Sequence, residues 1–249
     1  MASETKLRWR WLDTGLGRPA WNMAVDEALL EAFAADPRAR PVLRVYGWSP
    51  AGFSLGRFQP RDDLTPPSGA EVVRRLSGGA AIYHQSDELT YSVVARYRDL
   101  GGRPKAVYAT LHGVLAEALR ALGVPVGGDG PSGPAVRRGL CYAHPTDYDL
   151  LARGRTLVGS AQRRLRDAFL QHGSIPRSPH PATGATSLAE LMAEPPSREA
   201  LAAAIRAAFA ERWEVEDSAL TRHESDAASQ LQRTRYDTEE WASAGLTST

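Results

Sequence analysis

A pair of glycines between two strand-like segments constrains this chain more than any other feature. Residues 74–79 read Arg-Arg-Leu-Ser-Gly-Gly, residues 71–73 before them are rich in β-branched side chains, and residues 89–94 after them alternate in character. Glycine lets the backbone adopt a positive φ, and its missing Cβ leaves room for another group against the peptide plane. The segment therefore predicts either an ordinary hairpin turn or a glycine-lined wall beside a ligand.

A second run of small residues favours the ligand-binding interpretation. Residues 159–162 read Gly-Ser-Ala-Gln between further strand-like segments, and the chain has one cysteine, Cys141. Two glycine-lined strand turns and one thiol predict a narrow slot for an extended ligand. The alternative role for a single cysteine is that of a small buried apolar residue.

Composition and charge exclude several classes of protein. The chain has 249 residues, 43% of them hydrophobic, which is enough for one sizeable core or for a main domain with a small appendage. Its formal net charge of +1 gives no overall field that would attract nucleic acid or a membrane surface. One cysteine cannot form an internal disulfide, and the sequence contains neither a secretory signal nor the ~18 apolar residues that span a bilayer. We therefore expect a soluble, cytoplasmic protein with no nucleic-acid, membrane or metal partner, since the histidines and the cysteine lack metal-ligand spacing.

The pattern of apolar residues predicts an α+β fold with two long helices. The first helix begins at Pro19, and its apolar stripe leaves Asn22 and Asp26 on the opposite face, where we expect a solvated or cap-like pair. The second helix covers residues 104–122. Strands are expected over residues 7–12, 42–48, 53–58, 71–73, 89–94, 148–152, 155–159 and 163–172, with further helices after Ser197 and near residues 224–233 and 237–243.

Several motifs follow one another in a specific order. They are the Arg-Arg-Leu-Ser-Gly-Gly segment, His84, residues 87–92 (Asp-Glu-Leu-Thr-Tyr-Ser), the segment around Cys141 with Pro145 and Tyr148, the Gly-Ser-Ala-Gln segment and residues 170–174 (Leu-Gln-His-Gly-Ser). In this order they resemble the biotin/lipoate protein ligase superfamily. Within it, the chain is most similar to the cysteine-dependent octanoyltransferases of the LipM type and to the lipoate-protein ligase A family.

The resemblance implies a fold and a reaction. The fold would be a mixed β-sheet flanked by helices, as in class II aminoacyl-tRNA synthetases and biotin synthetases. Residues 1–249 would form one catalytic domain, with residues 190–249 as its helical C-terminal extension. The reaction would move an octanoyl group from acyl carrier protein to a lysine of a lipoyl domain, such as glycine cleavage H protein or the acyltransferase subunits of 2-oxoacid dehydrogenases. No cofactor is implied, because the carrier protein delivers the acyl group as a thioester.

The same resemblance implies roles for individual residues. Cys141 would be the nucleophile that holds the octanoyl group as a thioester. The family's lysine that lowers the pKa of this thiol falls at position 156, where this chain has Thr156. Substitutes for that charge are Arg137, Arg138, His144, Arg155 and Arg163. The substrate-binding residues would be Arg75, Ser77, Gly78, Gly79, Ala80, His84, Gly159, Ser160, Ala161 and His172, with the glycines and Ala161 lining the acyl slot and the two histidines shaping it.

Two other functions stay open at this point. An ATP-dependent lipoate or octanoate ligase would bind an acyl-adenylate, although Thr156 cannot supply the cation that such a phosphate needs. A non-catalytic acyl-binding homologue would keep the slot without turnover. Arg75 would either hold a phosphate or carboxylate of the ligand or pair with an acidic neighbour.

Overall fold

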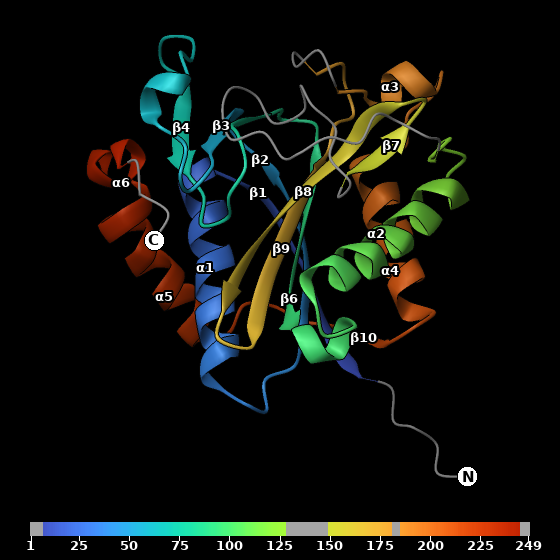
Figure 1. Ribbon diagram of the computed structural model, residues 1–249, viewed down its shortest axis with the longest axis horizontal. Helices are drawn as coiled ribbons and strands as arrows, with labels where there is room; N and C mark the ends of the chain where they lie inside the picture. Colours follow the sequence, from blue (N-terminus) through green and yellow to red (C-terminus); the bar gives the residue numbers. More distant parts are fainter. Residues whose placement is uncertain (1–6, 128–148, 181–184, 245–249) are drawn as a thin grey trace.

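A mixed sheet of seven strands runs through the centre of the molecule (Figure 1). The computed structural model describes residues 7–127, 149–180 and 185–244. In chain order the strands are β1 (Arg8–Gly17), β2 (Val42–Trp48), β6 (Leu89–Arg96), β7 (Leu150–Ala152), β8 (Arg155–Leu165), β9 (Ala168–Ile175) and β10 (Glu214–Asp217). Across the sheet their order is β10-β1-β2-β6-β9-β8-β7. β1 is parallel to β2 and β10 and the other pairs are antiparallel, which confirms the predicted α+β fold with a mixed sheet.

Helices cover both faces of this sheet. On one side lie α1 (Pro19–Ala35), α5 (Arg222–Leu231) and α6 (Glu239–Ser243), and on the other lie α2 (Pro104–Ala121) and α4 (Arg198–Ala210) (Figure 1). The remaining helical segments are η1 (Arg61–Asp63), η2 (Tyr97–Leu100), α3 (Leu188–Leu191) and the π-helical η4 (Gln232–Tyr236). Pro19 and Pro104 each stand at the start of a helix, where the missing N–H leaves no hydrogen bond unmade. Ser197 caps α4 as predicted, because its hydroxyl oxygen accepts the amide N–H of Ala200 at 3.1 Å.

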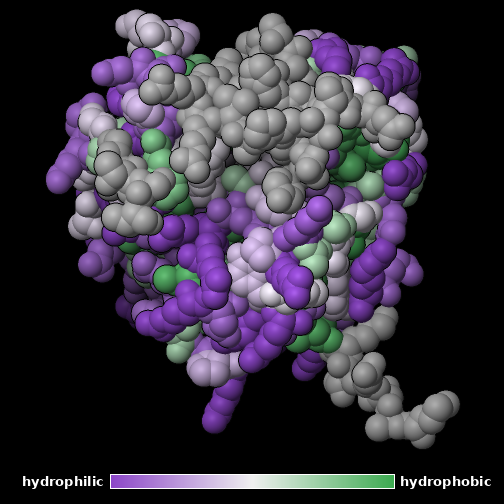
Figure 2. Space-filling view, viewed as in Figure 1, coloured by the Kyte–Doolittle hydropathy of each residue, from purple (hydrophilic) through white to green (hydrophobic). Residues whose placement is uncertain are grey.

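Each face of the sheet packs into an apolar core of its own. Successive side chains of a strand point to opposite faces, so Val45 of β2 joins the core under α2 and α4, whereas Tyr46 joins the core under α1. Every residue of β2 is buried, as expected for a strand with helices on both faces. On the face shown in Figure 2, the described residues that are visible are largely hydrophilic. No helix among the described residues is long and apolar enough to cross a membrane.

A second, three-stranded sheet carries the glycine pair, and it does not form the predicted hairpin. Its central strand β3 (Gly52–Leu55) pairs in parallel with β4 (Glu71–Arg74) and antiparallel with β5 (Ile82–His84). The segment between β4 and β5 therefore crosses the end of β3 instead of folding back on its own strand, and β6 belongs to the large sheet. The crossing is tight, since a Cβ on Gly56 would lie 1.8 Å from the carbonyl oxygen of Gly79. Gly79 itself has a φ of +92°, which glycine adopts without strain.

Three strand predictions near the second glycine segment have different outcomes. The hairpin of β7 and β8 is confirmed, with its tight turn at Arg153-Gly154. Residues 159–162 lie inside β8, so the prediction of a second glycine-lined turn is wrong. The single strand predicted over residues 163–172 is also wrong, because the chain reverses after Leu165 and Arg166 adopts a φ of 56° between β8 and β9. The predicted strand over 53–58 ends at Leu55, because Gly79 of the crossing segment lies against the next residue, Gly56.

Candidate functional site

A cavity lies where α1, the large sheet and the three-stranded sheet meet. It encloses about 300 Å³ of empty space, part of it open to solvent. Its lining residues are Met23, Tyr46, Trp48, Ser54, Arg75, Ile82, His84, Thr90, Ala161, His172, Gly173 and Ser174. These residues come from segments far apart in the sequence, so the fold builds a partly apolar cavity with a few polar groups, which is typical of a ligand site.

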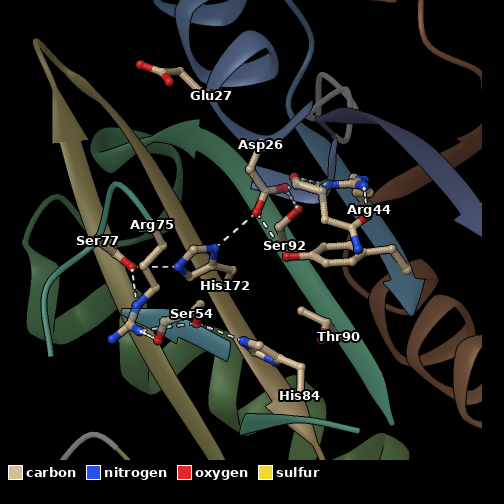
Figure 3. Close-up of polar contacts among 12 residues, drawn as sticks. Asp26, Glu27, Arg44, Ser54, Arg75, Ser77, His84, Thr90, Ser92 and His172 are labelled. Atoms are coloured by element: carbon tan, nitrogen blue, oxygen red, sulfur yellow. Dashed lines mark hydrogen bonds and ion pairs between the residues drawn. The ribbon is translucent and has the colours of Figure 1, made fainter. Parts of the chain in front are cut away.

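A serine, a histidine and an aspartate form a continuous hydrogen-bonded chain at this cavity (Figure 3). Ser77 Oγ lies 2.5 Å from His172 Nε2, and His172 Nδ1 lies 3.0 Å from Asp26 Oδ2. All three residues are buried. We call Asp26, His172 and Ser77 the Asp26 arm.

The carboxylate of Asp26 is the centre of further contacts. It accepts hydrogen bonds from Arg44 Nη1 at 2.7 Å, from the Tyr46 hydroxyl at 3.0 Å and from the Ser92 hydroxyl at 2.8 Å. Burial opposes ionisation, but Arg44 and these hydrogen bonds hold the pKa of Asp26 below its usual range. The prediction that Asn22 and Asp26 are solvated or cap-like is wrong, because their face of α1 turns toward β2 and each is 1% exposed.

A second chain of the same kind lies across the cavity. Ser54 Oγ lies 2.8 Å from His84 Nε2, and His84 Nδ1 lies 2.8 Å from Glu88 Oε1. The imidazole stacks on Trp48 at 3.7 Å between ring centroids, and burial lowers the pKa of His84. Burial opposes ionisation of Glu88 too, yet the contact with His84 and other hydrogen bonds lower its pKa. The other donors to Glu88 are the Thr90 and Ser174 hydroxyls and the amide N–H of Gln85. We call Glu88, His84 and Ser54 the Glu88 arm.

Arg75 joins the two arms. Its Nε donates to Ser77 Oγ at 3.2 Å, and its Nη1 donates to the hydroxyl and carbonyl oxygens of Ser54 at 3.3 and 2.8 Å. Its Nη2 donates to the carbonyl oxygens of Gly78 and Ala80 at 2.7 and 2.8 Å. A guanidinium has five N–H groups, so in this arrangement all five donate within the protein. The acceptors in these contacts are hydroxyl and carbonyl oxygens, so Arg75 supports the glycine segment and links it to Ser54.

A carboxylate beside each imidazole identifies one ring nitrogen that carries hydrogen. Asp26 and Glu88 accept, so Nδ1 of His172 and Nδ1 of His84 donate to them. Each serine oxygen accepts from Arg75 and also contacts Nε2 of its histidine. Burial opposes the charged form of His84 and lowers its pKa. The buried charges of Arg44 and Arg75 balance those of the two carboxylates.

Comparison with known proteins places the chain in a family. The model of the lipoyl protein ligase A/B catalytic domain matches residues 18–182. The chain belongs to this family. It is 43% identical to the octanoyltransferase LipM of Moorella thermoacetica over 187 residues, which are 70% of this chain and 66% of that protein, just under two thirds of its length. It is 33% identical to LipM of Kyrpidia tusciae over 94% of this chain and 97% of that protein.

Solved structures of the lipoyl ligase family have the same fold. A crystal structure of lipoate-protein ligase A bound with ATP matches with a TM-score of 0.75 over 97% of this chain and 100% of that chain, at 23% identity. The family match and the relatives confirm the predicted membership of the lipoyl ligases, and the shared fold confirms the predicted mixed sheet flanked by helices.

Most of the substrate-binding residues predicted from the family resemblance lie at or beside the cavity. Arg75, His84, Ala161 and His172 line the cavity, and Ser77, Gly78 and Ala80 contact Arg75 beside it. Gly79 is at the crossing over β3, and Gly159 is a buried residue of β8 that faces Ser174 of β9. Ser160 lies apart from the cavity, since its hydroxyl contacts the Tyr91 hydroxyl at 2.8 Å and His112 Nε2 at 2.9 Å.

The structure describes position 156 but not the predicted nucleophile. Cys141 lies outside the described residues, as do Arg137, Arg138 and His144. Thr156 is 1% exposed, and its buried hydroxyl has no hydrogen-bond partner among the residues that the structure describes. Arg155 pairs with Glu190 at 2.9 Å. Among the described residues Lys105 is the one lysine, and it is exposed at the start of α2, so no lysine lies beside the cavity in this part of the chain.

Within the two arms and their ion pair, the residues that were not predicted as site residues are Asp26, Arg44, Ser54 and Glu88. Glu88 lies in the quoted motif of residues 87–92, and Asp26 lies four residues after Asn22, so their positions were visible in the sequence. Their contacts depend on strand pairing between distant segments, which local patterns do not reveal.

Proposed function

We propose that this chain is an octanoyltransferase of protein lipoylation. Its relatives from Moorella and Kyrpidia carry that name, and the Kyrpidia protein aligns over nearly the whole of both chains. The observation that carries the proposal in this chain is the cavity, which Met23, Ile82 and Trp48 make partly apolar while Arg75 holds the glycine segment beside it. An eight-carbon acyl chain needs such an apolar slot, and its carbonyl end needs polar groups.

The donor and acceptor that we propose are those that the family resemblance implies. The octanoyl group arrives as a thioester on acyl carrier protein, and Cys141 takes it over as a second thioester. The amine of a lysine on a lipoyl domain, as in glycine cleavage H protein or the 2-oxoacid dehydrogenase acyltransferases, then attacks the carbonyl carbon. No cofactor takes part, because the thioester already holds the energy of the new amide. We place the reaction in the cytoplasm, where a free thiol stays reduced.

ATP-dependent ligation is the less favoured function. An acyl-adenylate needs cations at its phosphate, but the N–H groups of Arg75 all donate to protein oxygens in this arrangement. Thr156 adds no charge where the resembling family has a lysine. ATP–pyrophosphate exchange that depends on free octanoate or lipoate would establish ligase activity instead.

The test is the intact mass of the chain after incubation with octanoyl-loaded acyl carrier protein. We expect one added octanoyl group that hydroxylamine removes, that Cys141→Ser abolishes, and that disappears when a lipoyl domain is added as its lysine gains the octanoyl group. A chain that binds octanoate or the carrier protein without forming this adduct would be a non-catalytic homologue.

A matched pair of variants in β8 tests the cavity. Ala161→Leu places a larger side chain in the cavity and should reduce formation of the adduct. The control is Arg164→Leu. Arg164 lies in the same strand but is exposed, and the one hydrogen bond that the structure describes for its side chain runs from Nε to the carbonyl oxygen of Arg166. It should leave the adduct unchanged. Equal losses in both variants would contradict the assignment of this cavity to the acyl chain.

A further inference from the structure

The short helix α6 is hydrogen-bonded to the backbone immediately before Arg75. Trp241 of α6 donates its indole N–H (Nε1) to the carbonyl oxygen of Arg74 at 2.8 Å. That carbonyl and the amide N–H of Arg75 belong to one planar peptide unit, and the N–H donates to the carbonyl oxygen of Leu55 in β3 at 2.9 Å. The peptide unit at which Arg75 begins is therefore held from both sides.

The side chain of Arg74 returns this contact. Its Nε and Nη2 donate to the carbonyl oxygens of Trp241 and Ala242 at 3.1 and 2.9 Å. Its Nη1 donates to the carbonyl oxygen of Gly56 at 2.8 Å, and Gly56 is the residue against which Gly79 crosses β3. Arg74 is fully buried, so it joins α6 to the crossing through hydrogen bonds that water cannot replace.

Two pairs of chain neighbours divide their contacts between the cavity and the C-terminal helices. Arg75 holds the glycine segment beside the cavity, whereas Arg74 holds α6. In α1, Asp26 belongs to the Asp26 arm, whereas the carboxylate of Glu27 points away from that arm and contacts two residues of η4 (Figure 3). The C-terminal helices therefore contact both segments that supply the charged groups of the two arms' supports.

Trp241 lies where these two sets of contacts meet. The guanidinium carbon of Arg235 lies 5.0 Å from the centroid of its ring, and that of Arg57 lies 5.9 Å from it, so both cations are placed to interact with the indole. Arg235 is paired with Glu27, and the indole N–H reaches Arg74. One side chain thus links the contacts of α1 to those of the glycine segment.

We propose that Trp241 is a positioning residue for octanoyl binding, because its indole N–H fixes the peptide unit before Arg75 and thereby the glycine segment that borders the cavity. This inference rests on the proposed octanoyltransferase function, which assigns the cavity to the acyl chain. Residues 222–243 are all described, and none of them lines the cavity, so the effect acts through Arg74 and Arg75. The coupling is reciprocal, so octanoate in the cavity also stabilises α6.

The experiment compares octanoate binding by the original chain and by Trp241→Phe, measured by titration calorimetry. Phenylalanine keeps an aromatic ring but has no N–H, so the variant loses the hydrogen bond to the Arg74 carbonyl oxygen. We expect octanoate to bind about 5-fold more weakly, which corresponds to the loss of one such bond. Unchanged affinity would overturn the proposal.

Trp213→Phe is the matched control. Trp213 is also a half-buried tryptophan of the C-terminal part of the chain, but it packs on Trp9 and Phe209 at 5.1 Å between ring centroids, in the core on the other face of the sheet. This variant removes the same atoms and should leave octanoate affinity as in the original chain. An equal loss in both variants would show a general effect of destabilisation and would overturn the proposal.

Hydrogen exchange of the original chain tests the coupling in the reverse direction and does not need a variant that folds. Saturating octanoate should slow exchange of the amide hydrogens of residues 239–243 and leave those of α4 unchanged. No slowing in α6 would overturn the proposal.

A further comparison separates this inference from the proposed function. An original chain that neither binds octanoate nor forms the octanoyl adduct would contradict the proposed function. Exchange of the amide hydrogens of residues 75–80, without octanoate, would then decide whether Trp241 positions the glycine segment. It should be faster in Trp241→Phe than in Trp213→Phe, and equal rates would overturn the positioning role.

Discussion

The Asp26 arm and the Glu88 arm repeat one pattern with different surroundings. Each runs from Arg75 through a serine hydroxyl and an imidazole to a buried carboxylate (Figure 3). Asp26 is paired with the fully buried Arg44, whereas the nearest partners of Glu88 are neutral, namely His84 and two hydroxyls. The Asp26 arm also joins distant segments, α1 to β9, whereas Glu88 and His84 are four residues apart.

This difference separates two uses of a buried carboxylate. In the Asp26 arm the carboxylate neutralises a cation that is closed off from water, so the fold depends on its charge. In the Glu88 arm it gathers hydroxyl and amide donors at the start of β6, so the fold depends mainly on its hydrogen bonds. The two arms should therefore respond differently to the same substitution.

The largest expected effect is on stability when the Asp26 carboxylate is removed. Asp26→Ala leaves Arg44 as a buried charge without its carboxylate, so the free energy of unfolding should fall by about 3–5 kcal/mol. Urea unfolding followed by circular dichroism measures it. The double variant Asp26→Ala/Arg44→Met, which removes both charges, should recover part of the loss. A loss that stays below that of Glu88→Ala would show that the two arms do not differ in this way.

The next effect is a loss of stability at low pH, to which His84 of the Glu88 arm and His112, outside both arms, contribute. Burial lowers the pKa of His84 and lowers that of His112 to about 4. Between these folded values and the unfolded value of about 6.5, the unfolded chain binds more protons, so stability is present above that pH and is lost as the pH falls. His112 alone should account for about 3 kcal/mol of this loss by pH 4.

The control for this pH dependence is His112→Asn. His112 contacts Ser160, outside the cavity, so the substitution leaves the Glu88 arm intact. The acid loss that persists in this variant is expected to include the contribution of His84. If the free energy of unfolding of the His112→Asn variant did not change between pH 6.5 and pH 4, the neutral state of His84 would be contradicted.

A smaller loss is expected from Glu88→Ala. It removes the acceptor of several buried donors. The hydrogen bonds described for Glu88 come from His84, hydroxyls and an amide, so the free energy of unfolding should fall by about 1–3 kcal/mol. The matched comparison is Asp26→Ala in the same urea experiment. A loss equal to that of Asp26→Ala would mean that the charge of Glu88 balances a cation as strongly as Asp26 balances Arg44.

The sequence allowed the elements and part of the site to be predicted, and the limits have physical causes. The stripe of apolar residues predicted α1 and its start at Pro19. The same stripe led to the wrong prediction that Asp26 is solvated. A period of 3.6 residues identifies one buried face of a helix, but the sheet and α5 cover α1 from two sides. Glu27, on that helix, is buried for the same reason.

Strand pairing was the second limit. The glycine pair suggested a hairpin from local residues, but β4 and β5 both pair with β3, which lies some twenty residues earlier in the chain than β4. His84 and His172 were both predicted at the site from the family resemblance. Ser77 was predicted with them. The contacts of both serines with the two rings follow only from that pairing, since β3 supplies Ser54 and the crossing segment supplies Ser77.

The smallest expected difference lies between the two serines. Ser77 Oγ accepts from Arg75 Nε and shares a hydrogen bond with His172 Nε2. Ser54 Oγ accepts a longer bond from Arg75 Nη1, which also donates to the Ser54 carbonyl oxygen. The carbonyl remains in Ser54→Ala, so this variant should cost about 1 kcal/mol and Ser77→Ala about 1 kcal/mol more, when both are measured by urea unfolding. Equal costs would mean that Arg75 supports both arms alike, and the asymmetry between them would then lie in the carboxylates alone.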